Sequence, residues 1–552
     1  MLRNGTLLAF STLLSLSLSA QISTGGMPYG LRTGLELSPV PSVHGVAFDA
    51  VAVAEEDARR AAAGQIPAYS RVLPVHAGLD DAGAWRDLPN GDRLWRLQVI
   101  SDGALATELY FSDLFMPVNA SLYVYSPDGR HVLGGFTAFN NSEDGRFATV
   151  LIPGEASVVE YYEPHAVRGE GRVRVASVGH AYRDVDDVAG ASDFCEVDVN
   201  CSEGANWTEQ RDATVRVGIV DGGVGAWCSG ALVNNVEQDC KPYFLTAQHC
   251  GDGTSASDFN LWKFYFNYEK SGCGSGSSTS SHSVVGCTKR GASNDGGGDS
   301  GSDFLLLEAN NATIPSGYHP YWAGWDASGS GSSGGVCIHH PAGDRKKIST
   351  FIGNTSSNTW GGVPNTHWRV GWSATANGHG VTEGGSSGSP LFNSNHRIIG
   401  TLTGGGSSCT NTNFPDYFGK VSYHWQSNPG PTSTRLKNWL DPQSTGTLIL
   451  DGSYDPCGMT VGVAEPMEAP LRMEVHPNPA TDGVVVALPE EMKPNGTLEV
   501  RDMGGRLVAT MSAGSSSTAR LDTSPLESGA YLLRLLGDGK LLATAPLIVV
   551  HH

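Results

Sequence analysis

Two stretches of the chain alternate apolar and polar residues, with turn residues between the alternating runs. The first, from residue 21 to about 185, contains ASLYVYSPDGRHVLGGFTAFNN and FATVLIPGEASVVEYYEP, and the second begins at residue 471 with LRMEVHPNPATDGVVVALP. Because a period of two places every other side chain on one face of a strand, both stretches predict β-sheet. One short helix is expected over residues 52–64, AVAEEDARRAAAG, where Ala, Glu and Arg dominate.

The composition changes between these two stretches. All ten cysteines lie between Cys195 and Cys457, in a region that is also rich in Gly, Trp and His. This region is expected to be a separate domain with its own covalent framework. Residues 458–470, GMTVGVAEPMEAP, have the Pro, Glu and Ala content of a linker. The 71 glycines fit an all-β protein with many turns.

The first 20 residues have the pattern of a cleaved secretory signal. A basic Arg3 precedes an apolar run from Leu7 to about Leu18, and small residues end at Ala20. A membrane anchor is the alternative, but serines interrupt the run, which is too short to span a bilayer, and no transmembrane span is expected elsewhere. Export to an oxidising compartment predicts disulfides, and the absence of a CxxC pair disfavours zinc. The formal net charge of -20 disfavours nucleic acid as a partner.

Three motifs of the middle region carry the residue types of acyl-transfer chemistry. PYFLTAQHCG brings an apolar run to His249, GSDFLLLEA places Asp303 at the head of another, and GGSSGSP holds Ser386 and Ser387 between glycines. A serine nucleophile needs an imidazole to take its proton, a carboxylate to orient the ring, and N–H groups to receive the oxyanion. A Gly-Ser cluster alone is usually a linker, and a lone His at a strand end is usually structural. The ordered set in one domain favours a serine hydrolase.

The same motifs resemble TAxHC, D[IF]xLL and GxSGxP of the chymotrypsin-fold serine endopeptidases. The resemblance is most extensive with the bacterial lysyl endopeptidases, and further segments such as CEVDVNC, YWAGWD, IHHPAGDRKKIS and NWLDPQSTG extend it over residues 190–455. It implies a double β-barrel in which Ser387 is the nucleophile, His249 the general base and then acid, and Asp303 the orienting carboxylate. The N–H groups of Gly385 and Ser387 would form the oxyanion hole. No cofactor and no metal are expected.

The resemblance also implies a pocket for a basic P1 side chain. The acidic residue of tryptic enzymes lies six positions before the serine, which is Val381 here, and the lysyl endopeptidases supply the acid at the position of Asp416. A buried carboxylate without a partner would select a cation strongly. A turn residue is the alternative for Asp416.

The remaining pocket positions depart from the family in one place. The resemblance assigns Trp360, Thr403 and Gly404 to the substrate site, although Trp360 is as readily a core residue. Thr403 stands where the family has a histidine that narrows the pocket together with the aromatic position. Trp360 is therefore expected to lack its stacking partner, and the pocket wall is expected to be more open to arginine.

The family framework implies three of the disulfides, Cys195–Cys409, Cys201–Cys273 and Cys228–Cys250. For the other four cysteines, which allow several pairings, the expected bonds are Cys240–Cys337 and Cys287–Cys457. His339 and His340 are expected to be structural, because adjacent strand residues face opposite sides and do not readily share one ion. The acidic segment SNDGGGDSGSD, residues 293–303, lacks the spacing of an EF-hand and is expected to be a loop.

The flanking regions resemble parts of exported bacterial enzymes. Residues 21–189 resemble the propeptide of the same peptidases, a prodomain that shields the enzyme or helps it fold. The family is cut near Gly190, usually after a basic residue, but Ala189 precedes it here and Arg183 is the nearest candidate. Ser386 replaces the Asp that pairs with the freed amino terminus in tryptic zymogens, so that ion pair is not expected.

The last region contains VHPNPATDGVVV, LEVRDMGGRLV and ESGAYLLRLL. These segments resemble the type-A sorting domains of the type IX secretion system of Gram-negative bacteria. The resemblance implies a small β-sandwich that is read by the outer-membrane export machinery and then usually removed. A carbohydrate-binding or adhesive sandwich is the alternative.

The sequence thus predicts an all-β preproenzyme, a monomer that is secreted or held on the surface of a Gram-negative bacterium. Its expected parts are a signal peptide (1–20), a propeptide (21–189), a serine endopeptidase domain (190–457), a linker (458–470) and a sorting domain (471–552). The expected reaction is hydrolysis of proteins or peptides after a basic P1 residue, preferably Lys, through an acyl-enzyme. The alternatives are cleavage after Arg as well as Lys, and a surface adhesin without catalytic activity.

Overall fold

The computed structural model describes most of the 552 residues. The description leaves out residues 1–25, 34–38, 64, 184–191, 279–281, 311–312, 459–470, 488–495, 503–506, 513–517, 538–539 and 552. The predicted signal peptide, the junction near Gly190 and nearly all of the predicted linker lie outside the described residues. None of the helices in the described part is long and apolar enough to cross a membrane. The chain divides into two compact units, Met1–Met459 and Thr460–His552.

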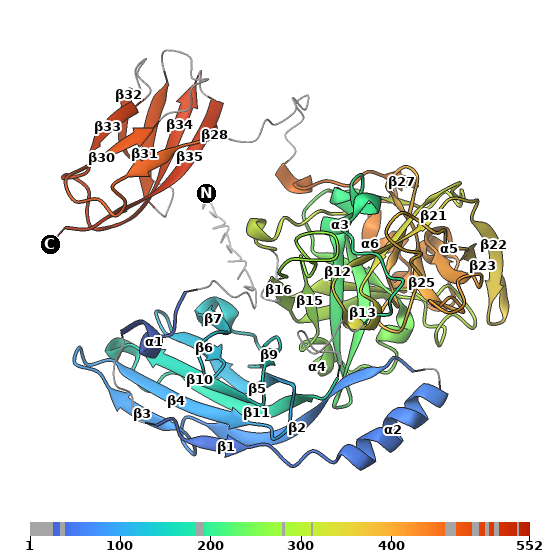
Figure 1. Ribbon diagram of the computed structural model, residues 1–552, viewed down its shortest axis with the longest axis horizontal. Coiled ribbons are helices and arrows are strands. Elements are labelled where there is room, and N and C mark those ends of the chain that lie inside the picture. Colours follow the sequence, from blue (N-terminus) through green and yellow to red (C-terminus); the bar gives the residue numbers. More distant parts are fainter. Residues whose placement is uncertain are drawn as a thin grey trace, which may run out of the picture. The chain divides into compact units, whose positions relative to one another are not determined.

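Within residues 26–183, the described residues form two layers of strands, antiparallel except for one parallel pair, around one hydrophobic cluster (Figure 1). Trp95 and Leu97 of one layer and Leu109 and Phe111 of the other are buried in that cluster. The layer-forming strands are β1 (Ser42–His44), β3 (Ala84–Asp87), β4 (Arg93–Ile100), β6 (Ser121–Tyr125), β7 (Val132–Phe136) and β10 (Ala156–Glu163) on one side, and β2 (Ala68–Gly78), β5 (Ala106–Phe115), β8 (Phe147–Ala148), β9 (Ile152–Pro153) and β11 (Arg172–Ala181) on the other. The predicted strands are therefore present in this region.

Helix α2 (Ala50–Ala62) accounts for the predicted helix, and a short helix α1 (Tyr29–Thr33) precedes it. The side chain of Asp49 accepts hydrogen bonds from the N–H groups of Val51 and Ala52, which satisfies donors of the first turn. The residues that follow α2 lead into β2, which leaves this region and joins the next.

Strand β2 is shared between the N-terminal region and the cysteine-rich region. It pairs antiparallel with β13 (Val224–Val233), with Ala226 opposite Ala68 and Val224 opposite Arg71. Through this pairing, one sheet runs from β5 and β11 of the N-terminal region into β13 and β12 of the next. The two regions thus form a single compact unit rather than two separate domains joined by a linker.

The cysteine-rich region consists of two mainly antiparallel sheets that share one apolar cluster and also pack on further clusters of their own. In the described strands, neither sheet closes on itself through backbone hydrogen bonds. The first sheet contains β12 (Thr214–Asp221), β13, β14 (Tyr243–Thr246), β15 (Lys263–Tyr265), β16 (Ser283–Val285), β17 (Cys287–Ala292) and β18 (Leu305–Ala309). The second contains β19 (Trp325–Asp326), β20 (Gly335–His339), β21 (Lys347–Phe351), β22 (Ser356–Trp360), β23 (Val363–Val370), β24 (Pro390–Asn393), β25 (Ile398–Gly405), β26 (Asp416–Lys420) and β27 (Ile449–Leu450).

Short helices connect or follow these strands. They are α3 (Thr208–Ala213), α4 (Ala256–Phe259), α5 (Val421–Gln426) and α6 (Lys437–Leu440). Helices α5 and α6 come after the last long strand of the second sheet and pack against the apolar cluster between the sheets through Trp425 and Leu440. Both sheets are therefore held together by a common core.

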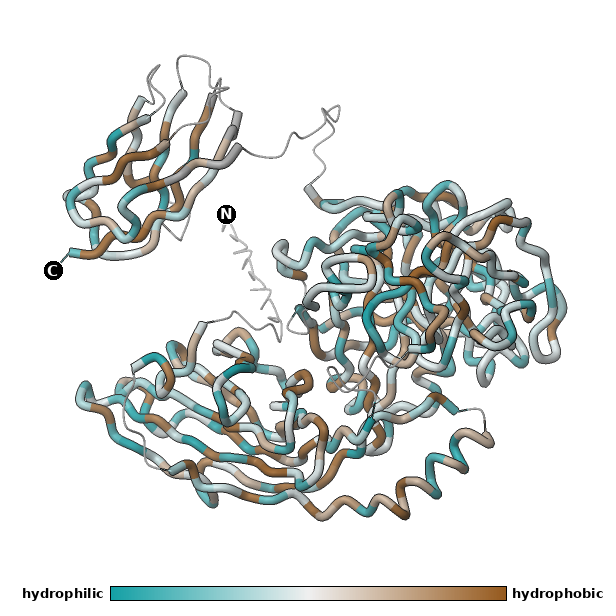
Figure 2. Tube along the Cα trace, in the orientation of Figure 1, coloured by the Kyte–Doolittle hydropathy of each residue, from teal (hydrophilic) through white to brown (hydrophobic). Residues whose placement is uncertain are grey.

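The smaller unit consists of a five-stranded and a three-stranded sheet that bury one apolar cluster. Buried and exposed residues alternate along its strands, and Figure 2 shows apolar and polar segments interleaved there. The strands are β28 (Leu471–Arg472), β31 (Thr497–Asp502), β32 (Leu507–Ser512), β34 (Gly529–Gly537) and β35 (Lys540–Val549) in the larger sheet, and β29 (Glu474–His476), β30 (Gly483–Ala487) and β33 (Thr518–Asp522) in the smaller. This small β domain matches the predicted fold class.

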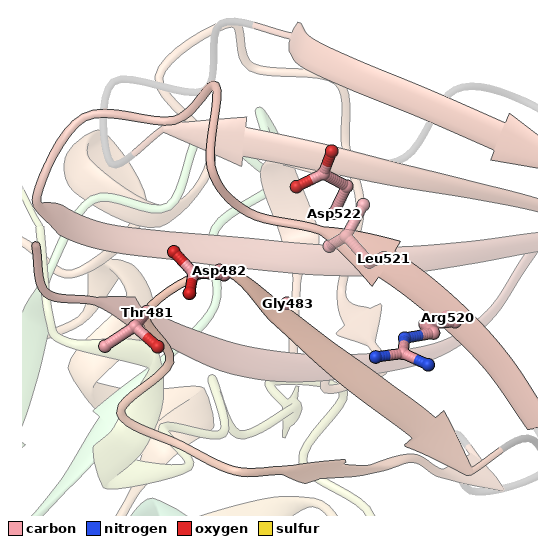
Figure 3. Close-up of a pocket in the computed structure, with 6 residues that line it drawn as sticks. All are labelled: Thr481, Asp482, Gly483, Arg520, Leu521 and Asp522. Carbon is pink, nitrogen blue, oxygen red and sulfur yellow. The ribbon is translucent and has the colours of Figure 1, made fainter.

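A surface depression of the smaller unit lies where β30 begins and β33 ends (Figure 3). Asp482 and Asp522 lie near each other there, because Gly483 pairs with Asp522 across the two strands. Arg520 lies farther along the same edge. The depression holds no set of groups that could carry out acyl transfer.

Candidate active site

The pairing of β14 with β18 brings the predicted histidine and aspartate together. Strand β14 ends at Thr246, opposite Leu305, and a short 3-10 turn (Gln248–Cys250) then carries His249. Asp303 stands just before β18 and is fully buried. Its Oδ2 lies 2.7 Å from Nδ1 of His249, and its Oδ1 accepts the backbone N–H of His249 at 3.0 Å. Both oxygens of one carboxylate therefore fix the orientation of the imidazole.

Asp303 is held by a second acid that the sequence analysis did not single out. The buried carboxylate of Asp295 accepts the N–H of Asp303 at 2.7 Å and the N–H of Gly298 at 3.1 Å. Asp303 has a φ of +56°, a left-handed conformation that is uncommon outside glycine and that surrounding bonds must hold. The expected loop at residues 293–303 is present, and its acidic residue Asp295 stabilises the backbone of Asp303.

The electrostatics of this pair favour an anionic Asp303 and a basic His249. Burial raises the pKa of Asp303, but the charge of His249 and the hydrogen bonds to it outweigh burial and hold that pKa below its ordinary value. Burial lowers the pKa of His249, but the charge of Asp303 and the same hydrogen bond outweigh it and raise the pKa above 6.5. The imidazole can therefore take a proton more readily than a free histidine.

The loop before Ser387 directs backbone N–H groups to one place. The carbonyl of Gly384 accepts the N–H of Ala342 at 2.6 Å. In a trans peptide the C=O and the N–H point in opposite directions, so the N–H of Gly385, in the same peptide, is directed away from Ala342. Ser229 anchors the loop, because its hydroxyl donates to the carbonyl of Gly385 and its N–H donates to the carbonyl of Ser387. Within the described residues, the N–H groups of Gly385 and Ser387 have no acceptor. They are available to an oxyanion.

Gly385 requires a glycine. Its φ is +95°, and a Cβ at this position would lie 2.9 Å from the nitrogen of Gly343 and from the carbonyl oxygen of His340. An alanine would therefore be strained and would push against a neighbouring turn. The positions of the N–H groups of Gly385 and Ser387 therefore depend on a glycine at residue 385.

The Cys228–Cys250 disulfide brings the histidine turn to the serine loop. Cys250 follows His249 directly, and its Sγ lies 3.8 Å from the carbonyl oxygen of Ser387. The side chain of His249 is 22 % exposed, and Ser387 is half-buried. Among the described hydrogen bonds, none joins the ring of His249 to the hydroxyl of Ser387; in free enzymes such bonds are often long and tighten when substrate binds.

Ser386 and the two adjacent histidines belong to the core beneath this loop. The hydroxyl of Ser386 lies 2.7 Å from Nδ1 of His339, whose Nε2 lies 3.1 Å from the hydroxyl of Ser349. His340 instead directs its Nδ1 to the carbonyl of Asp344. The two rings therefore have different partners, as expected for structural residues. In the described part of the chain, both groups of side chains close enough to bind a metal include a disulfide-bonded cysteine, so neither offers a thiolate.

Asp416 is buried as predicted, but it is not without partners. Its Oδ2 accepts hydrogen bonds from the side chains of Trp372, Thr382 and Ser407, and its Oδ1 accepts only the N–H of Ser407. Burial raises the pKa of this carboxyl, and the hydrogen bonds lower it in part. Oδ1 lies so close to Gly405 that a Cβ there would be 1.9 Å away. Among the described hydrogen bonds, Oδ1 thus has one donor and Oδ2 has three.

Trp360 is expected to lack its stacking partner, and the imidazole that lies near it in the structure is tilted by 37° rather than stacked on the indole. The ring centroid of Trp360 lies 6.0 Å from that of His367 and 5.4 Å from that of Tyr417. Thr403 stands at the family's histidine position, and its hydroxyl lies 3.0 Å from Nε2 of His367. The imidazole of His367, on the strand β23 that pairs with β22, therefore lies beside Thr403. Trp360 also covers Gly404, where an added Cβ would lie 3.4 Å from the indole.

The disulfides correct one part of the sequence analysis. The bonds Cys195–Cys409, Cys201–Cys273 and Cys228–Cys250 are present, and the fourth is Cys240–Cys457. The expected pairs Cys240–Cys337 and Cys287–Cys457 are wrong. Cys287 and Cys337 are free and buried because β17 and β20 place them in separate apolar clusters, in which the thiols contact the carbonyl of Phe259 and the hydroxyl of Ser389.

Comparison with known proteins identifies two parts of the chain. Residues 189–419 match the family model described as the lysyl endopeptidase C-terminal domain, and residues 474–549 match the secretion system C-terminal sorting domain. The sorting domain directs the protein to the surface of a Gram-negative bacterium or to the medium.

Several solved structures of serine proteases resemble parts of the chain at low similarity. One is a thermostable serine protease from an extremophilic microorganism (15% identity, 38% of this chain and 92% of that chain, TM-score 0.29). Another is the protease Anisep from Arthrobacter nicotinovorans (16% identity, 38% and 90%, TM-score 0.28). A third is a Glu endopeptidase in complex with MPD (16% identity, 42% and 95%, TM-score 0.27). Scores of this size carry no argument about function, which rests on the family matches.

Residues 189–419 are thus a serine endopeptidase domain of the lysyl endopeptidase type, and the same chain carries a secretion sorting domain at residues 474–549.

Proposed function

We propose that this domain cuts peptide bonds after a basic P1 residue, preferably Lys, with Ser387 as nucleophile, His249 as general base and then acid, and Asp303 as the orienting carboxylate. The observation that carries the proposal is that one carboxylate, that of Asp303, binds His249 twice. Its Oδ2 lies 2.7 Å from the ring Nδ1, and its Oδ1 accepts the backbone N–H at 3.0 Å. The free N–H groups of Gly385 and Ser387 support an oxyanion hole beside the nucleophile. An acyl-enzyme follows from attack by the serine oxygen.

The preference for a basic residue rests on Asp416. Asp416 is 1 % exposed, and its Oδ1 accepts one hydrogen bond and lies against Gly405, which has no side chain to cover it. When the ammonium group of a substrate lysine reaches this oxygen, the buried carboxylate gains an oppositely charged partner, which offsets the cost of its burial. The proximity of His367 to Trp360 supports a closed pocket wall, which favours Lys over the broader guanidinium of Arg.

The test is to digest a denatured protein with the mature enzyme and to identify the cleavage sites by mass spectrometry. Cleavage after Lys is expected in the wild type, and Ser387→Ala is the inactive control. Loss of one partner from a buried charge pair costs about 2–5 kcal/mol, so Asp416→Asn should lower kcat/KM for Lys substrates by about 30-fold or more. Cleavage without preference for Lys or Arg, or an Asp416→Asn variant with unchanged kcat/KM for Lys, contradicts the assignment of the pocket.

We also propose that residues 21–189 are a propeptide that occupies the side of the cleft bound by the leaving half of the substrate. Ile66 packs against the apolar cluster that contains the Cys228–Cys250 disulfide, and a Cβ on Gly384 would lie 2.8 Å from Pro67. The next residue, Ala68, pairs with Ala226 of β13. An extended propeptide segment thus runs beside the nucleophile loop. His249 and Ser387 are both partly exposed, which supports a segment that leaves the nucleophile accessible.

Because the propeptide segment covers only one side of the cleft, the precursor should still react with small reagents. A fluorophosphonate should label Ser387 in the precursor, whereas a protein substrate should be cut only after the propeptide is removed. Equal rates of protein cleavage by precursor and mature enzyme would contradict the propeptide assignment. Arg183, the nearest basic residue before Gly190, is ion-paired with Asp57 at 2.7 Å, so a cut there must break that contact.

A further inference from the structure

Lys and Arg are distributed unequally along the chain. Residues 21–189 contain 13 Arg and no Lys, whereas residues 190–552 contain 12 Arg and 10 Lys. Lys241 is the first lysine of the whole sequence. The region proposed as a propeptide thus lacks the residue after which the protease domain is proposed to cut.

A protease that selects Lys therefore finds no site at which to release this propeptide. Arg is not an equivalent substrate, because its guanidinium is planar and broader than the compact ammonium of Lys. The same limit applies to a second copy of the enzyme that acts on the precursor. Removal of residues 21–189 at a basic residue thus requires an endopeptidase that accepts Arg.

Arg183 is the last basic residue before the protease domain. It lies two residues after Ala181, at which the last strand of the propeptide, β11, ends, and its side chain is 40 % exposed. The next basic residue is Arg211, which lies within helix α3 of the protease domain. A cut after Arg211 would separate Cys195 and Cys201 from the backbone of the protease domain, so Arg183 is the basic residue at which a cut leaves that domain intact.

The contacts of Arg183 leave it available to the pocket of another protease. Its guanidinium lies 2.7 Å from the carboxylate of Asp57 and donates to the carbonyl of Ala68. Asp57 also pairs with Arg71 at 2.7 Å and accepts the hydroxyl of Tyr182 at 2.9 Å, so withdrawal of Arg183 leaves no unpaired charge on Asp57. A partly exposed ion pair contributes little free energy, so breaking it is a small cost.

We propose that a second endopeptidase, one that cuts after Arg, converts the precursor by hydrolysing the peptide bond on the carboxyl side of Arg183. Water supplies the hydroxyl of the new carboxyl group and a proton for the new amino group. The inference rests on the proposed preference of the domain for Lys, because an enzyme that also accepts Arg converts its own precursor. Activity on proteins is then switched on by another protease and not by the enzyme itself.

A charge-conserving substitution exchanges the protease that can make this cut. The full-length precursor carrying Ser387→Ala, with or without Arg183→Lys, is incubated separately with clostripain, which cuts after Arg, and with the mature enzyme obtained from the unsubstituted chain. Clostripain should cut after Arg183 and the mature enzyme should not. In Arg183→Lys both results should reverse, with each rate changing by at least about tenfold. Amino-terminal sequencing and intact mass identify the product that begins at residue 184.

The matched control is Arg130→Lys, in the turn between β6 and β7, where the side chain is 82 % exposed. This variant should leave conversion by clostripain unchanged, and the mature enzyme should not make the product that begins at residue 184. Removal of the propeptide from the Ser387→Ala chain by the mature enzyme overturns the proposal. Equal conversion by clostripain with and without Arg183→Lys also overturns it, because the cut then lies elsewhere.

A measurement on the unsubstituted chain covers the case in which Arg183→Lys does not fold. The precursor should remain full-length when it is incubated alone, and clostripain should start its cutting of a denatured protein after Lys. Conversion of the isolated precursor, or no gain of activity with clostripain, contradicts the inference. Failure of the proposed function is distinguishable, because a fluorophosphonate would then not label Ser387, or the digest would show no preference for Lys. The cut after Arg183 by clostripain is read from mass alone.

Discussion

The buried ion pair between Glu108 and Lys263 should be the strongest single link between the N-terminal region and the protease domain. Glu108 comes from β5 and Lys263 from β15, both side chains are fully buried, and Nζ lies 2.6 Å from Oε2. The second oxygen of Glu108 accepts the hydroxyls of Tyr69 and Tyr110. Nearby, the ring of Tyr69 stacks on Trp227 of β13 with centroids 4.1 Å apart.

The substitution Glu108→Gln removes one charge and leaves the other buried. Breaking a buried pair in this way costs about 3–5 kcal/mol, whereas replacing both partners with apolar or neutral groups is often tolerated. Glu108→Gln should therefore lower the free energy of unfolding by about 3–5 kcal/mol, and Glu108→Gln with Lys263→Met should recover most of that loss.

The assay is urea unfolding of the full-length chain, followed by tryptophan fluorescence, in a Ser387→Ala background that prevents self-cleavage. The matched control is Asp81→Asn, which breaks the exposed pair between Asp81 and Arg174 and should cost less than about 1 kcal/mol. Glu108→Gln and Asp81→Asn with equal effects would refute the reasoning. So would a double variant that is less stable than Glu108→Gln alone, because removal of the stranded cation should help.

Three further predictions concern the site and the cysteines. Asp303 raises the pKa of His249 above 6.5, and only the neutral ring can act as base. In the mature enzyme, kcat/KM should therefore fall with decreasing pH with a midpoint above pH 6.5, and a midpoint below pH 6 would contradict this prediction. Gly385→Ala should lower kcat about 10²–10³-fold, as for loss of one oxyanion donor, with KM for Lys peptides nearly unchanged, which steady-state kinetics can measure. Thiol titration with DTNB should find no reactive thiol in the native chain and two after denaturation without reductant. The reason is that Cys287 and Cys337 are free and that burial raises the pKa of both thiols. A thiol that reacts in the native state would show that one of them is accessible.

Local sequence patterns were sufficient for the parts of the site that short motifs encode. TAQHC places a histidine and a disulfide at the end of a buried strand, and the apolar run after Asp303 predicts the strand that pairs with it. The glycines around Ser387 predict a bent loop, and Gly385 adopts the positive φ that such a loop needs. These features depend on neighbours in the chain, so the sequence shows them directly.

Features that depend on distant segments could not be predicted in the same way. Trp360 has an imidazole near it, but the ring comes from His367 of β23 rather than from position 403 of β25, and only the pairing of β26 with both strands brings them into one sheet. Cys240 and Cys457 are 217 residues apart, and only the fold shows that Cys337 is directed into a different cluster. No motif indicated that β2 would extend the sheet of the protease domain.

The Cys240–Cys457 disulfide determines what can be trimmed from the carboxyl end without loosening the enzyme. Cys457 is the last half-cystine of the chain and comes immediately before the segment that leads to the sorting domain. A cut after Cys457 discards the tail and leaves the new chain end tied to residue 240. A cut between the last strand, β27, and Cys457 leaves the tail attached through sulfur, and only a reductant would then release it.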